Sequence, residues 1–231
     1  MKGMENFTVE VSPETFEWLG LTISQSQVTL FIVTLLLVAF GLVFRYYLFP
    51  KFTERPGKFQ NVIELLVEAA GKMADSNLHG KCAGLYAYSF SMMVLMVTSY
   101  LMELLGMRIP ATDFNFTFAV AVMSLVVIVY YGVKYKGGWG YIKSFGKPLG
   151  IMWPFRVLSE LLIPVSLSCR MFGNLFAAMV VMDIVYEAMS YFAIGIPALL
   201  ALYFNLFDVG IQVYIFVTLT QIFTGEAIEE D

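Results

Sequence analysis

Three runs of apolar residues in the first half of the chain predict upright membrane-spanning helices. They cover about residues 28–49, 85–105 and 116–133, and each is long enough for a helix to cross a bilayer. Pro50 is expected to end the first helix, since proline cannot continue a helical hydrogen-bond pattern. Asp113 precedes the third run, where its carboxylate can cap the helix by accepting free amide hydrogens.

The second half of the chain holds two longer apolar runs, 154–191 and 194–225. Each exceeds the length that one crossing requires, so these helices must tilt steeply or lie along the membrane plane. Gly195–Pro197 predicts a turn between them, and Gly225 is expected to end the second helix. The two runs therefore predict a long helical hairpin over residues 154–225.

The segments between the apolar runs are polar and divide the chain. Residues 1–27 form a polar, amphipathic lead in which Ser12–Glu14 is expected to start a helix, and residues 28–231 form a single transmembrane domain. Residues 61–70 repeat apolar side chains at helical spacing, which favours a helix along the membrane surface.

Positive charge gathers in two long loops, 51–81 and 134–148. The second loop contains Gly137–Gly138, which predicts flexibility. Basic loops stay in the cytoplasm, whereas the lead is acidic, so the N-terminus is expected outside and the C-terminus inside. The N-terminus resembles neither a signal peptide nor a transit peptide, which indicates a bacterial or plastid-encoded origin. The expected location is the cell inner (plasma) membrane, with the thylakoid membrane as the alternative.

Composition agrees with an all-α, polytopic membrane protein. Of the 231 residues, 59% are hydrophobic, which excludes an ordinary soluble domain. The net charge is −4 and the basic residues are scattered, so no nucleic-acid surface is indicated. Cys82, Cys169 and His79 show no metal-ligand spacing, and neither a metal nor a cofactor is expected.

Arg170 is the first functional candidate, because it lies in the middle of the first hairpin helix. An arginine remains charged, and at membrane depth its charge costs at least ~2.5 to 3.5 kcal/mol on insertion scales. It is therefore expected to face a water-filled path or a partner. Asn174 lies four residues further on, on the same helical face. The alternative is an arginine that snorkels to a headgroup, but apolar sequence continues on both sides.

Further polar side chains interrupt both hairpin helices. Glu160 and Asp183 lie on the first helix, with Asp183 on a face largely different from that of Arg170, while Asp208 and Gln212 form one stripe on the second. Glu103 and Glu187 fit a role in the path and a purely structural place, at headgroup level or in a buried pair, equally well. One fixed positive charge between two polar tracks is what an ion path with a barrier needs, because the charge blocks a continuous cation leak.

Two stretches of the hairpin resemble the signature helices of subunit a of rotary F-type ATP synthases. They are Pro-Val-Ser-Leu-Ser-Cys-Arg-Met-Phe-Gly-Asn at 164–174 and Gln-Val-Tyr-Ile-Phe-Val-Thr-Leu-Thr at 212–220, and residues 110–117 resemble a third, weaker segment. The resemblance implies a hairpin curved against a ring of c subunits, which two offset half-channels reach on either side of an essential arginine. It also implies peripheral-stalk b subunits, a separate soluble catalytic head, and no catalysis by this chain.

Carried over by position, the resemblance makes Arg170 the essential arginine, with Asn174 and Gln212 as its polar neighbours. Two positions that often carry ionisable side chains in the family are Met179 and Asn205 here, while carboxylates stand one turn away at Asp183 and Asp208. Counted along antiparallel helices, these two acids lie about 13 Å apart along the axis, so they are expected to be separate steps of one water-filled track.

The inner half-channel is expected to depend on one acid. A position eight residues before the signature proline, often a carboxylate in the family, is Arg156 here, whereas Glu160 matches the position four before it.

Other classes of membrane protein fit less well. A secondary transporter would show two repeated halves, and an intramembrane hydrolase would need a nucleophile with its base or a metal-binding motif. A purely structural assembly subunit would not need Arg170. The sequence does not decide between proton and sodium as the coupling ion, because selectivity depends on the ring, and it does not give the number of c subunits.

Overall fold

The chain is an all-α, polytopic membrane protein with a small N-terminal hairpin. The computed structural model describes residues 15–18, 21–52, 57–78, 83–146, 150, 153–189 and 195–229. Five helical segments in this part of the chain are long and apolar enough to cross a membrane, as the apolar runs predict; they are 25–51, 84–101, 114–136, 153–189 and 209–228.

Two short strands precede the first helix. β1 (Thr15–Trp18) pairs antiparallel with β2 (Leu21–Ser24). The predicted helix start at residues 12–14 lies outside the described residues, but a helix over the segment that follows is wrong. Threonine, isoleucine and aromatic side chains at these positions favour extended backbone. α1 (Gln25–Val43) then begins at a capping box in which the Ser24 hydroxyl accepts from the Gln27 amide.

Helical backbone continues beyond α1 for longer than the sequence predicts. A π-helical turn covers Phe44–Leu48 and a 3₁₀ turn covers Phe49–Lys51, so Pro50 lies inside the last turn and does not stop it. Pro50 stands at the start of this 3₁₀ turn, where proline is tolerated because the first residues of a helical turn leave their amide groups unbonded in any case.

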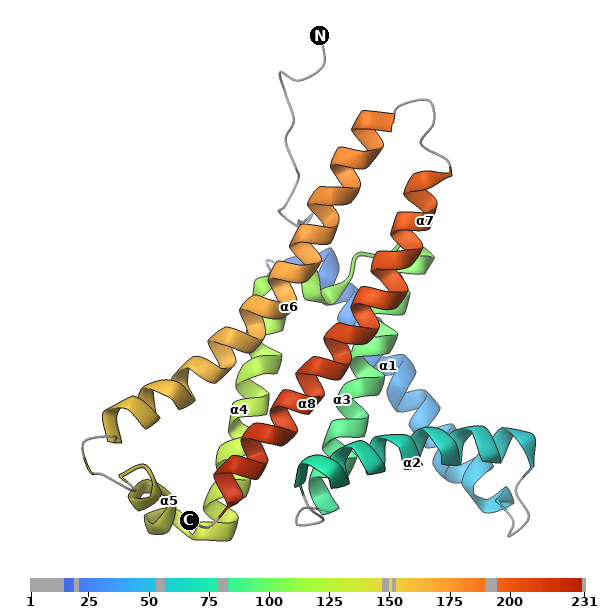
Figure 1. Cartoon of the computed structure of the whole chain (residues 1–231). Coiled ribbons are helices and arrows are strands. Elements are labelled where there is room, and N and C mark those ends of the chain that lie inside the picture. The colour runs from blue at the N-terminus through green and yellow to red at the C-terminus, as the bar shows by residue number, and fades with distance from the viewer. Residues whose placement is uncertain are drawn as a thin grey trace.

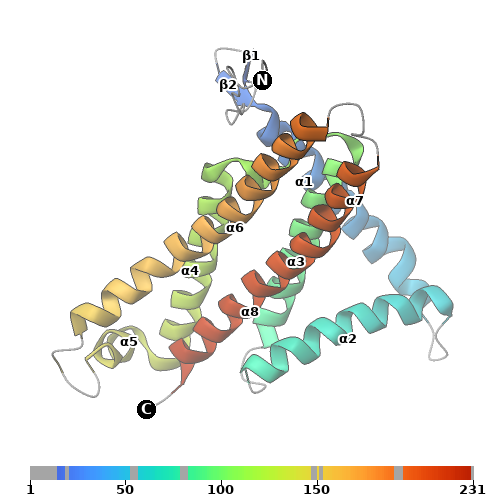
Figure 2. The same ribbon diagram turned by 45° about the horizontal axis from the view of Figure 1, so that its top comes forward.

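α2 (Lys58–Leu78) is the helix that the periodicity of residues 61–70 predicts, and it runs across the ends of α1 and α3 in both views (Figures 1 and 2). Its second half is anchored, since Ala74 and Leu78 are buried in a cluster with Leu85 and Ile228. The apolar side chains of its first half, such as Phe59, are exposed.

α3 (Ala83–Leu101) and α4 (Phe114–Lys136) stand behind the hairpin (Figure 1). A 3₁₀ turn (Met102–Leu105) ends at Gly106, whose φ of 74° favours glycine. After a second 3₁₀ turn (Pro110–Thr112), Asp113 caps α4 as predicted, with its Oδ1 accepting from the Asn115 amide at 2.9 Å.

A short helix replaces the expected flexible loop after α4. α5 (Gly138–Ser144) follows Gly137, whose φ of 74° turns the chain, so flexibility across the whole of 134–148 is wrong. The two glycines turn the backbone once, and the aromatic residues after them pack back on the bundle, with Tyr141 buried. Residues 147–149 lie outside the described part.

The hairpin consists of α6 (Trp153–Met189), α7 (Ile196–Leu202), a π-helical turn (Tyr203–Asp208) and α8 (Val209–Ile228). α6 has 37 residues and is therefore about 55 Å long, well beyond the ~30 Å of a hydrocarbon core. α6 and α8 run obliquely to α3 and α4 in both views (Figures 1 and 2). This is the tilted arrangement that the length of the runs predicts.

α4 contacts both hairpin helices, and the main hydrophobic core lies where α3, α4, α6 and α8 meet. Gly225 does not end α8 as predicted, because the helix continues to Ile228. A Cβ atom at Gly225 would lie 3.1 Å from the carbonyl oxygen of Asn77 in α2. This glycine is therefore explained by close helix packing rather than by a cap.

Candidate functional site

Arg170 lies near the middle of α6 on the side that faces away from the bundle. The opposite side of α6 carries Pro164, Leu167, Met171 and Leu175, all buried in the protein. Arg170 itself is exposed, and exposed small residues surround it along the same side at Ser166, Cys169, Gly173 and Ala177. Small side chains allow another helix to approach closely. The charge is therefore presented on a smooth, accessible helix face.

One hydrogen bond crosses the hairpin next to this face. Asn174 Nδ2 donates to Gln212 Oε1 at 2.7 Å, joining α6 to α8. Gln212 is buried, whereas Asn174 is exposed. The structure thus brings together these two predicted site residues one turn from Arg170.

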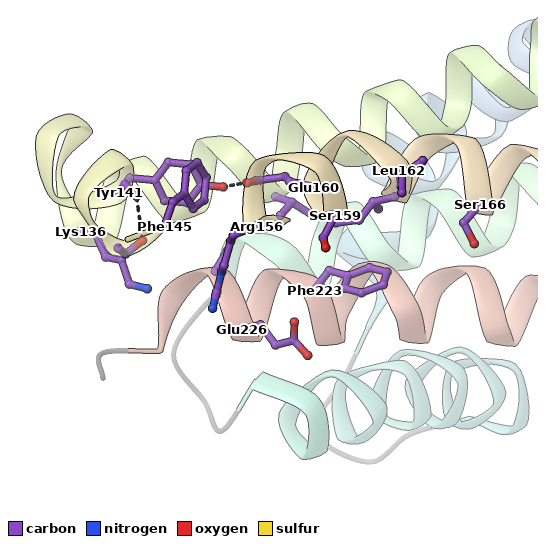
Figure 3. Close-up of a pocket in the computed structure, with 14 residues that line it drawn as sticks. Lys136, Tyr141, Phe145, Arg156, Ser159, Glu160, Leu162, Ser166, Phe223 and Glu226 are labelled. Atoms are coloured by element: carbon purple, nitrogen blue, oxygen red, sulfur yellow. Dashed lines mark hydrogen bonds between the residues drawn. The ribbon is translucent and has the colours of Figure 1, made fainter. Parts of the chain in front are cut away.

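One cavity lies at the end of the hairpin formed by the start of α6 and the end of α8. This Glu160 cavity has a volume of about 470 Å³ and includes Arg156, Glu160 and Ser166 from α6 and Glu226 from α8 (Figure 3). Dependence of the inner half-channel on Glu160 alone stays a prediction, and a second carboxylate, Glu226, lines the same space.

Tyr141 hydrogen-bonds the Glu160 carboxylate from α5 (Figure 3). Burial and the neighbouring Glu160 raise the pKa of the Tyr141 phenol, so it remains protonated and acts as the donor. Sequence reasoning missed Tyr141, since it lies in a basic segment expected to be a loop. No local pattern marks this pair, because the two residues meet through tertiary packing.

The second cavity lies at the opposite end of the hairpin. This Asp208 cavity has a volume of about 360 Å³ and is lined from α6 by Asn174, Met179 and Asp183 and from the second hairpin segment by Asp208 and Gln212. The side chain of Asn205 lies outside the described part. Asn174 and Asp183 stand about 180° apart around α6, and both line this cavity. The two polar faces that the sequence predicts on this helix are therefore the two sides of one surface that lines the cavity.

Glu103 is a further acid in the Asp208 cavity that sequence reasoning did not assign to the path. It is half-buried, and its Oε2 has no hydrogen-bond partner among the described residues. Glu187 is exposed and is not among the residues that line the cavity. A glutamate at the end of α3 reaches the hairpin only because α3 packs behind it, which local sequence does not reveal.

Arg170 lies between the two cavities. Along α6, residues up to Ser166 line the Glu160 cavity and residues from Met171 onward line the Asp208 cavity. The five-residue step between these two corresponds to about 7.5 Å of helix. Both cavities contain ionisable side chains, and the segment that separates them carries a permanent positive charge.

Within the described residues, no three His, Cys, Asp or Glu side chains come close enough together to hold a metal ion. Cys169 is free and exposed. Cys82 and His79 lie outside the residues that the structure describes.

Comparisons with known proteins agree over most of the chain. A model of the ATP synthase A chain family matches residues 27–225. The ATP synthase subunit a of Priestia megaterium is 29% identical over 234 residues, covering 94% of this chain and 97% of the relative. That of Limosilactobacillus fermentum is 27% identical over 246 residues, covering 98% of each.

A relative from Propionigenium modestum, an ATP synthase subunit a described as sodium ion specific, is 32% identical over 118 residues, which cover 51% of this chain and 40% of the relative. The family model covers far more than half of the chain, and the signature stretches around Arg170 and Gln212 lie within the match. The chain therefore belongs to the family of subunit a of F-type ATP synthases.

Proposed function

We propose that this ion-translocating stator subunit moves its ion through the Glu160 cavity and the Asp208 cavity, with Arg170 as the barrier between them. One observation carries the proposal: the two cavities share no residue of α6, and Arg170 stands in the short segment that separates them. A cation can therefore enter either cavity from its own end, but it has no continuous path past the fixed positive charge. The family assignment does not favour the alternative of a secondary transporter.

The partner that completes the path is a ring of c subunits seated on the exposed face of the hairpin. Besides the small residues around Arg170, the second hairpin segment exposes Phe207 in its π-helical turn and Ile211, Tyr214 and Ile222 in α8. Such a face is suited to contact with the helices of a ring. It offers apolar surface for packing, and it presents the Arg170 guanidinium.

Electrostatics then gives direction to the transfer. A ring carboxylate opposite Arg170 is stabilised in its charged form and releases its ion there. After moving past the arginine it is reloaded from the other cavity, because an ionised carboxylate is too costly to carry into lipid. Each elementary charge that moves down the membrane potential supplies roughly 2.3 kcal/mol per 100 mV, and this biases the rotation of the ring.

The orientation follows from the distribution of basic residues. α2, α5 and the end of α8 lie at one end of the helices, and β1 and β2 lie at the other (Figure 2). The lysines of α2 and α5 put the first end in the cytoplasm of a bacterium, with the protein in the inner (plasma) membrane. The Glu160 cavity is then the inner half-channel. Peripheral-stalk b subunits and the soluble catalytic head are further partners, and catalysis belongs to the head.

The first test is ion-driven ATP synthesis in vesicles that carry the assembled complex. Arg170→Ala should abolish synthesis while the complex still assembles, whereas Arg45→Ala, at an exposed arginine near the end of α1, should leave it close to wild type. Addition of a protonophore or of sodium to the wild type would identify the ion. Unimpaired synthesis in the Arg170→Ala complex would show that the residue is structural and would refute the proposed barrier.

A further inference from the structure

The Tyr141 side chain lines the Glu160 cavity, although Tyr141 is not part of the hairpin. It comes from α5, and only 6% of the residue is exposed. Its hydroxyl donates to Glu160, which lies on the second turn of α6 (Figure 3). Among the described residues, Tyr141 is the one group that hydrogen-bonds this carboxylate.

The aromatic ring is held in place independently of Glu160. The Phe145 ring packs against it edge to face, with the two centroids 5.0 Å apart. On the other side it approaches the backbone of α4 at Gly132, where a Cβ atom would lie 2.9 Å from Cδ2 and 3.1 Å from Cζ of the ring, and closer still to Cε2. Ser144 also donates to the Tyr141 carbonyl oxygen at 2.7 Å. The phenol is thus preorganised to point at the carboxylate.

Charged groups from three elements surround the pair. Lys136 comes from the end of α4, Arg156 lies one turn before Glu160 on α6, and Glu226 comes from the end of α8. In Figure 3, Arg156 extends towards the end of α8, while Tyr141 approaches Glu160 from the opposite side. The four charged side chains of the cavity, Lys136, Arg156, Glu160 and Glu226, have no net formal charge. One hydrogen bond to Glu160 therefore has a noticeable effect on whether its charged or its neutral form is favoured.

We propose that Tyr141 is a positioning residue for ion exchange at Glu160: its hydroxyl fixes the carboxylate inside the cavity and stabilises the charged form that accepts the ion. The proposal rests on the proposed function, in which the Glu160 cavity is a half-channel. In the proton case, the carboxylate takes up one proton from the side of Arg170 and passes it to water at the cavity mouth, while the phenol keeps its own proton throughout. Tyr141 therefore acts through Glu160 and is not itself a carrier.

The test compares four complexes in vesicles: wild type, Tyr141→Phe, Glu160→Gln and the double variant. Tyr141→Phe keeps the ring and its packing and removes only the hydroxyl. We expect it to lower the rate of ion-driven ATP synthesis about three- to tenfold, because the variant loses one hydrogen bond to a charged group. In the Glu160→Gln background the same change should have no further effect, because the group that Tyr141 stabilises is gone.

A second readout separates positioning from packing. In Tyr141→Phe the amount of assembled complex should equal that of wild type while the rate falls, because the ring keeps its packing against Phe145 and α4. Tyr130→Phe is the matched control, since Tyr130 is exposed on α4 and is not among the residues that line the cavity. It should alter neither rate nor assembly.

Each outcome bears on the proposal. Additive losses in the double variant, or a Tyr141→Phe complex that fails to assemble, would each make Tyr141 purely structural and overturn the inference. A normal Tyr141→Phe complex beside an impaired Glu160→Gln complex would overturn it while leaving the half-channel intact. A normal Glu160→Gln complex would also overturn it, because Tyr141 acts through that carboxylate. A complex that stays normal when Glu160→Gln is combined with Glu226→Gln would instead refute the half-channel at this cavity, and with it the proposed function.

Discussion

The contact between Gly132 and Tyr141 gives a prediction whose size follows from the structure. An alanine at residue 132 would place its Cβ within 3.1 Å of three ring atoms of Tyr141. The ring has little room to retreat, because Phe145 packs against it. Overpacking of this kind costs about 1 to 3 kcal/mol, and we take the upper value. The better helix propensity of alanine offsets about 1 kcal/mol, which leaves a net loss of about 2 kcal/mol.

That loss should be visible as a shift in the thermal inactivation of the purified complex. A loss of about 2 kcal/mol lowers the midpoint by about 5 °C for a chain of this size. Displacing the ring also moves the phenol away from Glu160, so Gly132→Ala should also lower the rate of ATP synthesis relative to wild type.

Two variants control for the cause. Gly71→Ala in α2 has no atom within 4 Å of the added Cβ, so it should be neutral or stabilising. Combining Gly132→Ala with Tyr141→Ala should remove the steric part of the loss, because the ring is absent. A Gly132→Ala complex as stable and active as wild type would refute the close packing of α5 on α4.

Three further predictions concern the path and its supports. Asp208→Asn should reduce ion flux at least severalfold in vesicles, since it removes a carboxylate from the Asp208 cavity; unchanged flux would remove Asp208 from the path. Cysteines at Asp208 and Glu160 should react with a membrane-impermeant thiol reagent from outside and inside, respectively, and reaction of both from one side would contradict the orientation. Gln221→Leu deletes the 2.8 Å bond from Asn77 that joins α2 to α8, at ~0.6 to 1.7 kcal/mol, so limited proteolysis should cut α2 faster; wild-type rates would show that this bond does not anchor the helix.

Properties that depend on a single helix could be predicted from the sequence. The apolar runs indicate all five spanning helices, because lipid requires every backbone group of a span to be bonded within its own helix. Asp113 marks the start of α4 by a bond over two residues. Arg170 could be singled out because a charge among apolar residues is costly at membrane depth, whatever the helix packs against.

Properties that depend on packing between distant segments could not. Tyr141 meets Glu160 across 19 residues, and Glu103 meets the hairpin only after α3 has docked behind it. Gly225 is of a residue type that is common at helix ends, but here it allows α2 to pack closely against α8. In each case the local pattern allows several partners, and the fold selects one of them.

The support of α8 has a mechanical consequence. A turning ring pushes back on its stator with an equal and opposite torque, and a helix loaded from one side bends unless something braces it. α8 packs against α3 and α4, and its end is tied to α2 through Gln221 and the contact at Gly225. Since α2 lies across the other helices (Figure 1), it can spread that load sideways. In the proposed complex, the spacing between Arg170 and the ring can then remain constant while the ring turns.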